Sequence, residues 1–165
     1  MEAGEEFNVI PYGTEALGVM RIEKGHAAGP ELNGQTSAYD LGMGGMISGK
    51  KDFIGYTLGL REELQRDDRM QMVGFKPVNP NDLLLAGSHL LGLRDKATTE
   101  NDQGWISSCI YSPILGHYLG IGFIKGGHNR KGENVRAVDL VRGNDVEVEI
   151  CSPHFVDPEG ERLRV

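Results

Sequence analysis

The chain has 165 residues, of which 39% are hydrophobic, enough for one domain or one and a fraction with a core of its own. Its 24 acidic residues outnumber 17 basic ones, the formal net charge is -7, and the basic residues are scattered. This distribution argues against a surface for nucleic acid. The 24 glycines favour a protein rich in strands or loops over a helix bundle.

The first ten residues and the two cysteines indicate the cellular compartment of the protein. MEAGEEFNVI, residues 1–10, is acidic and lacks the basic and apolar parts of a signal peptide. No stretch approaches the ~18 apolar residues of a membrane span. Cys109 and Cys151 fit no zinc-binding spacing, and we interpret both as small buried residues with free thiols. We therefore expect a cytoplasmic protein with no membrane partner.

Residues 13–66 carry two helical patterns. In GTEALGVMRIEKG, residues 13–25, Thr14 is the predicted N-cap and Gly25 the C-terminal stop. After a glycine-rich passage, DFIGYTLGLREELQR, residues 52–66, predicts a second helix capped by Asp52. The apolar side of this second helix consists of Phe53, Tyr56, Leu60 and Leu64.

Beyond a charged joint at residues 65–70 the pattern becomes that of β-strands. Strand candidates are residues 69–78, 103–112 and 117–127. Residues 135–153 form the clearest hairpin, because apolar and polar residues alternate on both sides of a turn at Gly143-Asn144. Short strands separated by turn signals predict a small barrel or sandwich.

Two glycine-rich motifs have the outline of nucleotide-binding loops. Residues 44–51, GGMISGKK, have a glycine–lysine frame, but Lys51 stands where a phosphate loop needs a hydroxyl to hold magnesium. The carboxylate of Asp52 would also compete with phosphate for the amides of the following helix. Residues 120–126, GIGFIKG, have one residue too many for a dinucleotide fingerprint, and a polar segment follows. We expect neither to bind a nucleotide, and we interpret the second as a glycine-containing barrel strand.

The other reactive side chains form no self-contained site along the sequence. The dispersed histidines are His26, His89, His117, His128 and His154. No pair of them has the spacing of metal ligands, and no cysteine lies close to them in sequence. No segment has the form of a nucleophile elbow, although a Ser-His-acid triad can assemble from distant parts of a chain. The residue pattern alone therefore predicts an α+β domain with a β-rich C-terminal half.

Four motifs in a fixed order carry a family resemblance. They are PYGTEALGVMRIEKGH (11–26), TSAYDLGMGGMISGKKDFIG (36–55), GWISSCIYSPILGHYLGIGFI (104–124) and VEVEICSPHFVDPEGERLR (146–164). Together they resemble the glycine-cleavage aminomethyltransferase superfamily over nearly the whole chain. The combination of PYGTEAL…RIEKG, KKDFIG and DPEGERLR is most similar to the α subunits of heterotetrameric sarcosine oxidases.

The resemblance implies an α+β fold in two parts. Residues 1–66 would be the C-terminal part of a ferredoxin-like folate-transferase central domain, and residues 67–165 a small antiparallel β-barrel. The chain would be the tail of a longer α subunit. In this family the complex oxidatively demethylates sarcosine to glycine and transfers the one-carbon unit to tetrahydrofolate. We expect the chain to be inactive alone, because the aspartate of the folate chemistry lies upstream in family members.

The family also implies cofactors and partners. Tetrahydrofolate would meet this part of the subunit, whereas FAD, FMN and NAD would bind elsewhere in the intact complex. The expected partners are the β, γ and δ subunits, the N-terminal part of the α subunit and a small-molecule substrate. The resemblance assigns no catalytic residue and no metal to this chain.

Folate contacts are implied at six positions, which are Tyr12, Glu15, Leu17, Met43, Gly45 and Tyr111. Leu17 stands where aminomethyltransferases typically have a folate-contacting arginine, and Gly45 where they often have a tryptophan. Tyr12 and Glu15 flank the same helix start, where helix capping and packing is the alternative role. Tyr111 lies where the barrel is expected to approach the site.

Arg21 and Glu23 match an Arg-Leu-Glu element of the family, for which we expect a buried structural salt-bridge role. Two alternatives to the sarcosine oxidase assignment stay open. One is an aminomethyltransferase or a dimethylglycine-oxidising relative. The other is a non-catalytic interaction module that has lost folate binding, which Leu17 and Gly45 favour.

Overall fold

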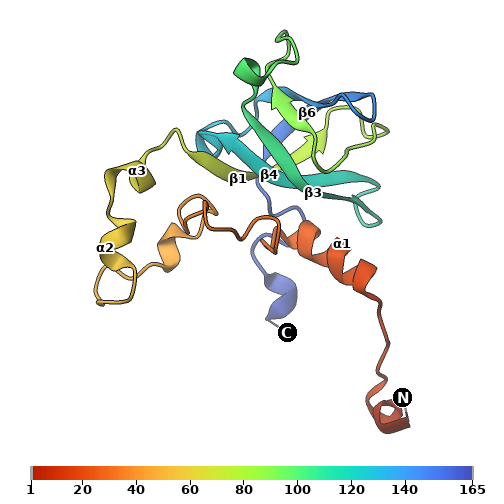
Figure 1. The fold of residues 1–165 in the computed structure, drawn as a ribbon. Helices are drawn as coiled ribbons and strands as arrows, with labels where there is room; N and C mark the ends of the chain where they lie inside the picture. The colour runs from red at the N-terminus through yellow and green to blue at the C-terminus, as the bar shows by residue number, and fades with distance from the viewer. Residues whose placement is uncertain (1, 165) are drawn as a thin grey trace.

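A computed structural model describes residues 2–164, and its centre is a closed barrel of antiparallel strands (Figure 1). The strands follow the order β1-β4-β3-β2-β5-β6 around the barrel. Their bounds are β1 Met70–Pro77, β2 His89–Leu91, β3 Gly104–Ser112, β4 His117–Lys125, β5 Asn134–Asp139 and β6 Asn144–Cys151. The barrel closes because β1 pairs with β4 on one side and with β6 on the other. The strands predicted at 69–78, 103–112 and 117–127 are confirmed.

The barrel interior is filled by aliphatic and aromatic side chains. Val73, Phe75, Leu90, Ile106 and Ile150 are fully buried within one cluster. In β6 the alternation of Val146, Val148 and Ile150 with acidic residues directs every second side chain inward. Each such side chain contributes roughly 1.5–3 kcal/mol when it is removed from water.

The hairpin predicted at 135–153 is confirmed, with a longer turn than two residues. β5 ends at Asp139 and β6 begins at Asn144, and Gly143 adopts a left-handed φ of 67°. The Asp139 carboxylate accepts a hydrogen bond of 2.9 Å from the backbone N–H of Arg142, which fixes the turn.

Gly120 and Gly122 belong to strand β4, as predicted, whereas Gly126 follows the strand and precedes η4. A Cβ at Gly122 would lie 2.2 Å from the carbonyl oxygen of Trp105, beside a register shift in β3 between Ile106 and Ser108. Two strands can approach this closely only because position 122 has no side chain. Close strand packing therefore explains why position 122 is a glycine, and no bound nucleotide is needed to explain it.

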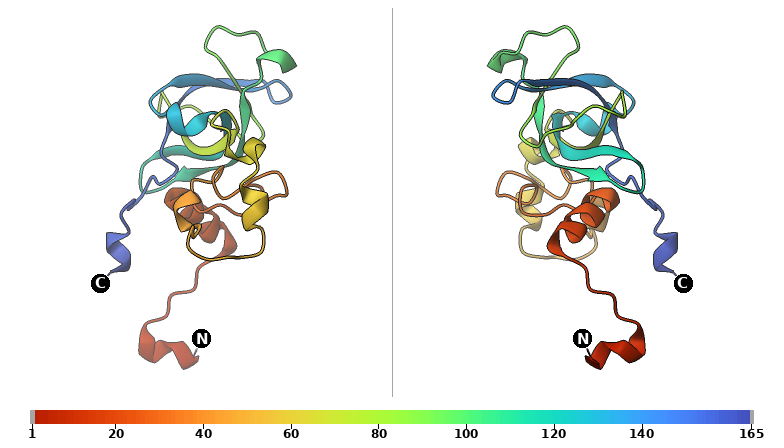
Figure 2. Two further views of the ribbon diagram at one scale, coloured as in Figure 1. Left: turned by 90° about the vertical axis from the view of Figure 1, so that its left-hand side faces the viewer. Right: turned by 90° about the vertical axis from the view of Figure 1, so that its right-hand side faces the viewer.

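The N-terminal segment lies against the outside of the barrel. Helix α1, Thr14–Lys24, packs on β3 and β4 (Figures 1 and 2). The prediction that Thr14 is the N-cap is wrong, because Gly13 occupies that position and Thr14 is the first helical residue. Gly25 ends α1 in a left-handed conformation, as predicted.

The helix predicted at 52–66 is wrong. Two single-turn helices, α2 Tyr56–Gly59 and α3 Glu62–Gln65, occupy this region, and Asp52 lies outside both. Gly55 precedes α2 with a left-handed φ of 95°, which interrupts any continuous helix through this position. Lys50 and Lys51 lie in a turn and bend with no strand or helix beside them, so residues 44–51 lack the strand-loop-helix frame of a phosphate loop.

The remaining turns are short 3-10 helices, η1 Glu2–Phe7, η2 Gly44–Met46, η3 Thr99–Asn101, η4 Gly127–Asn129 and η5 Glu161–Leu163. Both chain ends extend from the side of the barrel that carries α1, as all three views show (Figures 1 and 2). Among residues 2–164, no helix is long and apolar enough to cross a bilayer.

Candidate functional site

A buried polar cluster joins α1 and the following loop to the barrel. Its centre is Glu31, whose side chain is fully buried. The Glu31 carboxylate accepts hydrogen bonds from the hydroxyls of Ser107 at 2.5 Å and Ser108 at 2.8 Å. Arg21 donates to it from α1 at 3.2 Å, and the backbone N–H of Ala28 donates at 2.9 Å. With four donors, the buried charge is both neutralised and solvated by protein groups.

A second buried carboxylate on α1 makes a similar contact. Glu23 accepts a hydrogen bond of 2.5 Å from the Ser112 hydroxyl at the end of β3. Arg21 pairs with Glu31 rather than with Glu23. The expected structural salt bridge is therefore present for Arg21, whereas Glu23 is held by a hydroxyl.

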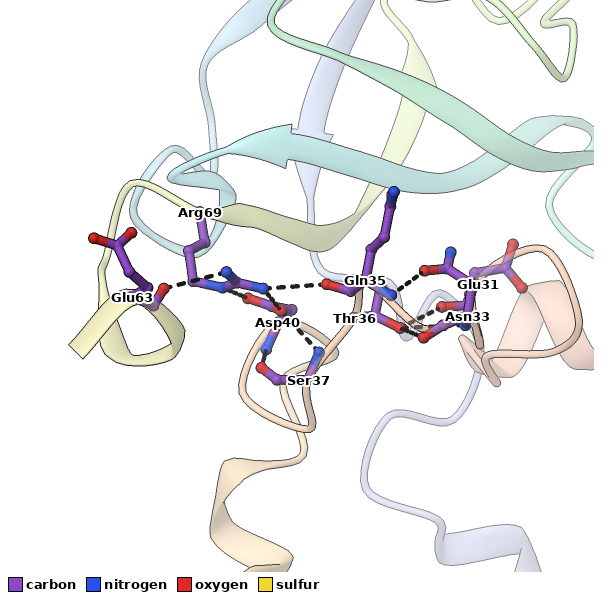
Figure 3. Close-up of polar contacts among 8 residues, drawn as sticks. All are labelled: Glu31, Asn33, Gln35, Thr36, Ser37, Asp40, Glu63 and Arg69. Carbon is purple, nitrogen blue, oxygen red and sulfur yellow. Dashed lines mark hydrogen bonds and ion pairs between the residues drawn. The ribbon is translucent and has the colours of Figure 1, made fainter. Parts of the chain in front are cut away.

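An arginine directly before β1 fastens the loop before η2 to the barrel (Figure 3). Arg69 donates to both carboxylate oxygens of Asp40, at 2.8 and 2.6 Å, and to the carbonyl oxygens of Gln35 and Glu63. Burial alone would raise the pKa of Asp40, but the hydrogen bonds from Arg69 and Ser37 outweigh it and hold this pKa below its ordinary value. Asp40 is therefore an ionised structural group at neutral pH.

The segment after β6 closes over the end of α1. The backbone N–H groups of Phe155 and Val156 both donate to the carbonyl oxygen of Glu23, at 2.9 Å. Lys24 extends from the same turn to the Asp157 carboxylate at 3.2 Å. A Cβ at Gly25 would lie 2.3 Å from the carbonyl oxygen of Pro153, so the fit at this junction requires glycine.

The cavities between the described residues include three with volumes of about 590, 210 and 180 Å3. The largest lies between β2, the loop that carries η3 and the β5–β6 turn. Figure 1 shows that loop above the barrel, whereas α1 lies below it. The largest cavity is thus remote from the polar clusters that hold α1.

Neither a metal centre nor a reactive thiol stands out. Among residues 2–164, no three His, Cys, Asp or Glu side chains converge to hold a metal ion. Both cysteines are free and partly buried. Burial raises the pKa of Cys109 and raises that of Cys151 to about 12, so both thiols are protonated at neutral pH.

Comparison with known proteins identifies the barrel. Residues 71–157 match the family model described as the glycine cleavage T-protein C-terminal barrel domain. The chain belongs to this family. The match covers more than half of the 165 residues and coincides with the six strands of the closed barrel.

Full-length relatives of this barrel-domain protein are much longer. Sarcosine oxidase subunit alpha of Rhizobium meliloti (strain 1021) is 42% identical over 100% of this chain, which spans 17% of that relative. The corresponding subunit of Corynebacterium sp. (strain U-96) is 37% identical over 97% of the chain and 17% of the relative. An aminomethyltransferase of Chloroherpeton thalassium is 30% identical over 76% of the chain and 33% of the relative.

A solved structure shares the fold of this barrel-domain protein over nearly the whole chain, and not only over the barrel strands. The glycine cleavage system aminomethyltransferase T from Bartonella henselae superposes with a TM-score of 0.64. The superposition covers 94% of this chain and 42% of that one at 17% sequence identity, which establishes the fold. The predicted fold, an antiparallel barrel preceded by part of an aminomethyltransferase-like α+β region, is confirmed.

The six candidate folate contacts lie in three places on the surface of the barrel-domain protein. Tyr12, Glu15 and Leu17 lie at the start of α1, where Tyr12 is 66% and Leu17 51% exposed. Met43 and Gly45 lie at η2, and Figure 1 shows η2 well apart from the N-terminal end of α1. Tyr111 lies near the end of β3, half exposed, with its ring against the edge of Tyr118.

The structure therefore groups three of the six candidates and leaves the others separate. None of the six lines any of the three cavities among the described residues. The start of α1 presents an apolar, partly aromatic surface that is open to solvent. Whether this surface contacts folate remains a prediction.

Sequence reasoning missed the buried carboxylates that hold the site together. Glu31 has no local signal, because its hydroxyl partners lie 76 and 77 residues later in the chain. Asp40 does have a local sequence signal, because Ser37 and Asp40 have the spacing of a capping box. The Asp40 carboxylate accepts from the Ser37 N–H at 2.8 Å, and the Ser37 hydroxyl accepts from the Asp40 N–H at 3.2 Å. The S-x-x-D spacing could have identified a structured turn there.

Proposed function

We propose that this chain acts as the C-terminal portion of a sarcosine oxidase-type α subunit. The observation that carries the proposal is identity of 42% and 37% to two sarcosine oxidase α subunits over nearly the entire chain, against 30% for an aminomethyltransferase over a shorter span. In the intact complex, sarcosine would be oxidatively demethylated to glycine, and tetrahydrofolate would accept the one-carbon unit. The 165-residue chain alone would be inactive.

The proposed role of this portion is to complete the folate-transferase unit. Residues 1–66 would complete its central domain, and residues 67–165 would form the terminal barrel. The Glu31 and Asp40 clusters support this role, because both tie residues 1–66 to residues 67–165 through buried carboxylates. The barrel would then serve as a rigid support that fixes the exposed face of α1 toward the upstream part of the subunit.

The candidate residues suit only one part of a folate molecule. Tyr12 and Leu17, which lie together at the start of α1, offer exposed apolar and aromatic surface, which suits the flank of a flat ring. The six candidates include no cation, and Glu15 is an anion, so none could neutralise the carboxylates of a glutamate tail. When bound, tetrahydrofolate would supply the nitrogen atoms that accept the one-carbon unit. This chain would cover the ring, and upstream residues would hold the rest.

The complex would need further cofactors and subunits. FAD, FMN and NAD would be bound outside this chain, and the β, γ and δ subunits would be its partners together with the upstream part of the α subunit. The apolar residues exposed on and before α1 suit such a covered surface. They are Phe7, Val9, Ile10, Tyr12, Leu17 and Met20.

Calorimetric titration of the intact α subunit with tetrahydrofolate tests the folate assignment. Saturable heat is expected. Leu17→Arg restores the arginine typical of aminomethyltransferases and should tighten binding about two- to fivefold, the worth of an exposed ion pair. Leu93→Arg is the matched control, since Leu17 and Leu93 are 51% and 48% exposed but Leu93 lies in the loop before η3. Equal effects of the two substitutions would contradict a folate contact at α1.

A non-catalytic interaction module is the second candidate, favoured by Leu17 and Gly45 in place of the folate-contacting residues. Absence of saturable heat with the intact subunit would support it over both folate-dependent functions. If folate does bind, turnover of sarcosine against dimethylglycine by the reconstituted complex distinguishes the two oxidases. Preference for dimethylglycine would overturn the sarcosine assignment.

A further inference from the structure

The largest of the three cavities described above has the dimensions of a small-molecule site. Its volume is about 590 Å3, within the range of roughly 300–1,000 Å3 that is typical of ligand pockets. It lies between β2, the loop that carries η3 and the β5–β6 turn, on the side of the barrel away from α1 (Figures 1 and 2). None of the six candidate folate residues lines it.

A histidine with an oriented ring faces this cavity. His89 Nδ1 lies 2.7 Å from the Oδ2 atom of Asp102, and both residues line the cavity. The other oxygen of Asp102 accepts a hydrogen bond of 3.1 Å from the N–H of Gly104, which fixes the carboxylate. Because a carboxylate accepts hydrogen bonds, Nδ1 is the donor in this contact, and in the neutral form of the imidazole Nε2 is then an acceptor. The His89 side chain is 62% exposed, so this acceptor is accessible.

The rest of the cavity is mainly apolar, although Thr98 and Thr99 also line it, and its charges are already paired. Leu91 and Val138 form part of the wall, and Leu140 and Val141 stand at the rim, 74% and 97% exposed. Arg142, the lining residue with a permanent positive charge, is bound to Asp139 and to the carbonyl oxygen of Ala86. An ionic ligand would therefore meet no free countercharge, whereas an apolar ligand would gain by displacing water from the walls.

We propose that this cavity binds a small apolar or aromatic molecule that carries one hydrogen-bond donor, an N–H or O–H group, which His89 Nε2 accepts. The apolar walls supply the affinity and the imidazole selects the donor. Asp102 acts as a positioning residue, because it fixes the tautomer that leaves Nε2 free to accept.

A matched pair of probes separates these two contributions. Indole has a flat apolar ring and one N–H, and 1-methylindole has the same ring without the donor. Each is titrated into the 15N-labelled full chain, and the backbone amide shifts are followed. We expect saturable shifts for indole at Gly87, Leu91 and Thr98, with dissociation constants on the order of 1 mM for so small a ligand. Indole should bind about three- to tenfold more tightly than 1-methylindole.

Two histidine variants complete the test. His89→Phe keeps an aromatic ring and removes the acceptor, so it should abolish the preference for indole while both probes still bind. His117→Phe, at the start of β4, is the matched control and should leave the preference unchanged. An amide spectrum with native dispersion verifies that each variant is folded.

The proposal is overturned if indole produces no saturable shifts at the cavity residues. It is also overturned if indole and 1-methylindole bind the unsubstituted chain equally, or if His89→Phe retains the preference. Binding by the unsubstituted chain should in addition be blocked in Ala97→Trp, which fills the cavity from its exposed loop. Unchanged indole binding by that variant would place the probe elsewhere and contradict the assignment.

Discussion

Glu31 is a single side chain on which the attachment of two parts of the chain depends. It is fully buried and accepts from α1, from the backbone at Ala28 and from two β3 hydroxyls. A buried carboxylate with all its hydrogen-bond partners contributes little net free energy to folding. Removal of one member of the cluster, however, leaves the others unpaired in a low-dielectric site. The consequence of a substitution is therefore much larger than the worth of any one bond.

Glu31→Ala should lower the free energy of unfolding by about 3–5 kcal/mol, because Arg21 and the Ser108 hydroxyl lose the carboxylate that accepts from them. Urea denaturation followed by circular dichroism measures the loss. Glu133→Ala is the control, since its ion pair with Arg130 is on the surface and should be worth at most about 1 kcal/mol. Losses of similar size in the two variants would contradict the structural role of the Glu31 cluster.

Asp40 gives the protein a pH-dependent contribution to stability. Burial would raise its pKa, but the hydrogen bonds from Arg69 and Ser37 leave the folded-state pKa below the unfolded value of about 3.9. The folded protein therefore binds this proton less readily than the unfolded chain does. The contribution is complete above the unfolded pKa and is lost as pH falls through the folded pKa.

The difference in stability between the unsubstituted chain and Asp40→Asn should thus be constant above about pH 5 and shrink as the pH falls below about 4. Urea denaturation of both proteins across this range measures it. A difference that is independent of pH throughout would show that the carboxylate charge has no part in fastening residues 35–40 to β1.

At the scale of elements, the long strands were predictable and the short or interrupted ones were not. β1, β3, β4 and the β5–β6 hairpin each carry six to nine residues of clear strand pattern, and all lie where predicted. β2 has only three residues, which is too few for an alternating pattern to emerge. Its existence depends on pairing with β3 and β5, which are distant in sequence.

The failed helix at 52–66 has a local cause. The apolar spacing of Phe53, Tyr56 and Leu60 is helical. However, Gly55 adopts a left-handed conformation, and a continuous helix would have no buried face to stabilise it.

The candidate site, like the helices, was only partly predictable from the sequence. Motif resemblance implied folate contacts at the start of α1, which stay a prediction, whereas the contacts that position α1 connect residues up to 133 positions apart.

Gly18 within α1 and Gly25 at its C-cap should respond oppositely to the same substitution. Gly18→Ala should stabilise the protein by roughly 0.5–1 kcal/mol, because no atom lies within 4 Å of the added Cβ and alanine favours a helix interior. Gly25→Ala should destabilise it by at least about 2 kcal/mol, because the position has φ of 72° and the Cβ would lie 2.3 Å from the Pro153 oxygen. Thermal unfolding measures both shifts. A Gly25→Ala variant as stable as the unsubstituted chain would contradict the tight junction between α1 and the segment after β6.

In the whole molecule, the residues between η2 and β1 are the part least supported by the barrel. Every residue of α2 and α3 is at least partly exposed, and Ile54 is fully exposed. Figure 1 shows this segment extending to one side of the barrel. A segment with so little buried surface opens at low free-energy cost.

Limited trypsin digestion of the full chain should therefore cut first at Lys50, Lys51 or Arg61 and leave the barrel intact. Mass spectrometry of the early fragments identifies the sites. Arg94 and Lys96, in the exposed loop before η3, serve as an internal comparison because that loop is anchored at both ends in the barrel. First cleavage at those two residues would contradict the proposed order of local stability.

The closure of the barrel through β1 has a consequence for how the chain folds. Both neighbours of β1, namely β4 and β6, come later in the chain, and β6 is the last of the six barrel strands to be synthesised. During synthesis β1 must therefore remain unpaired, with an apolar side chain such as Phe75 exposed, until residues 117–151 have left the ribosome. Pairing between strands so far apart in sequence is slow. Until it has paired, an apolar strand is prone to aggregation. The same closure that removes every edge from the finished barrel makes its first strand the most vulnerable during biosynthesis.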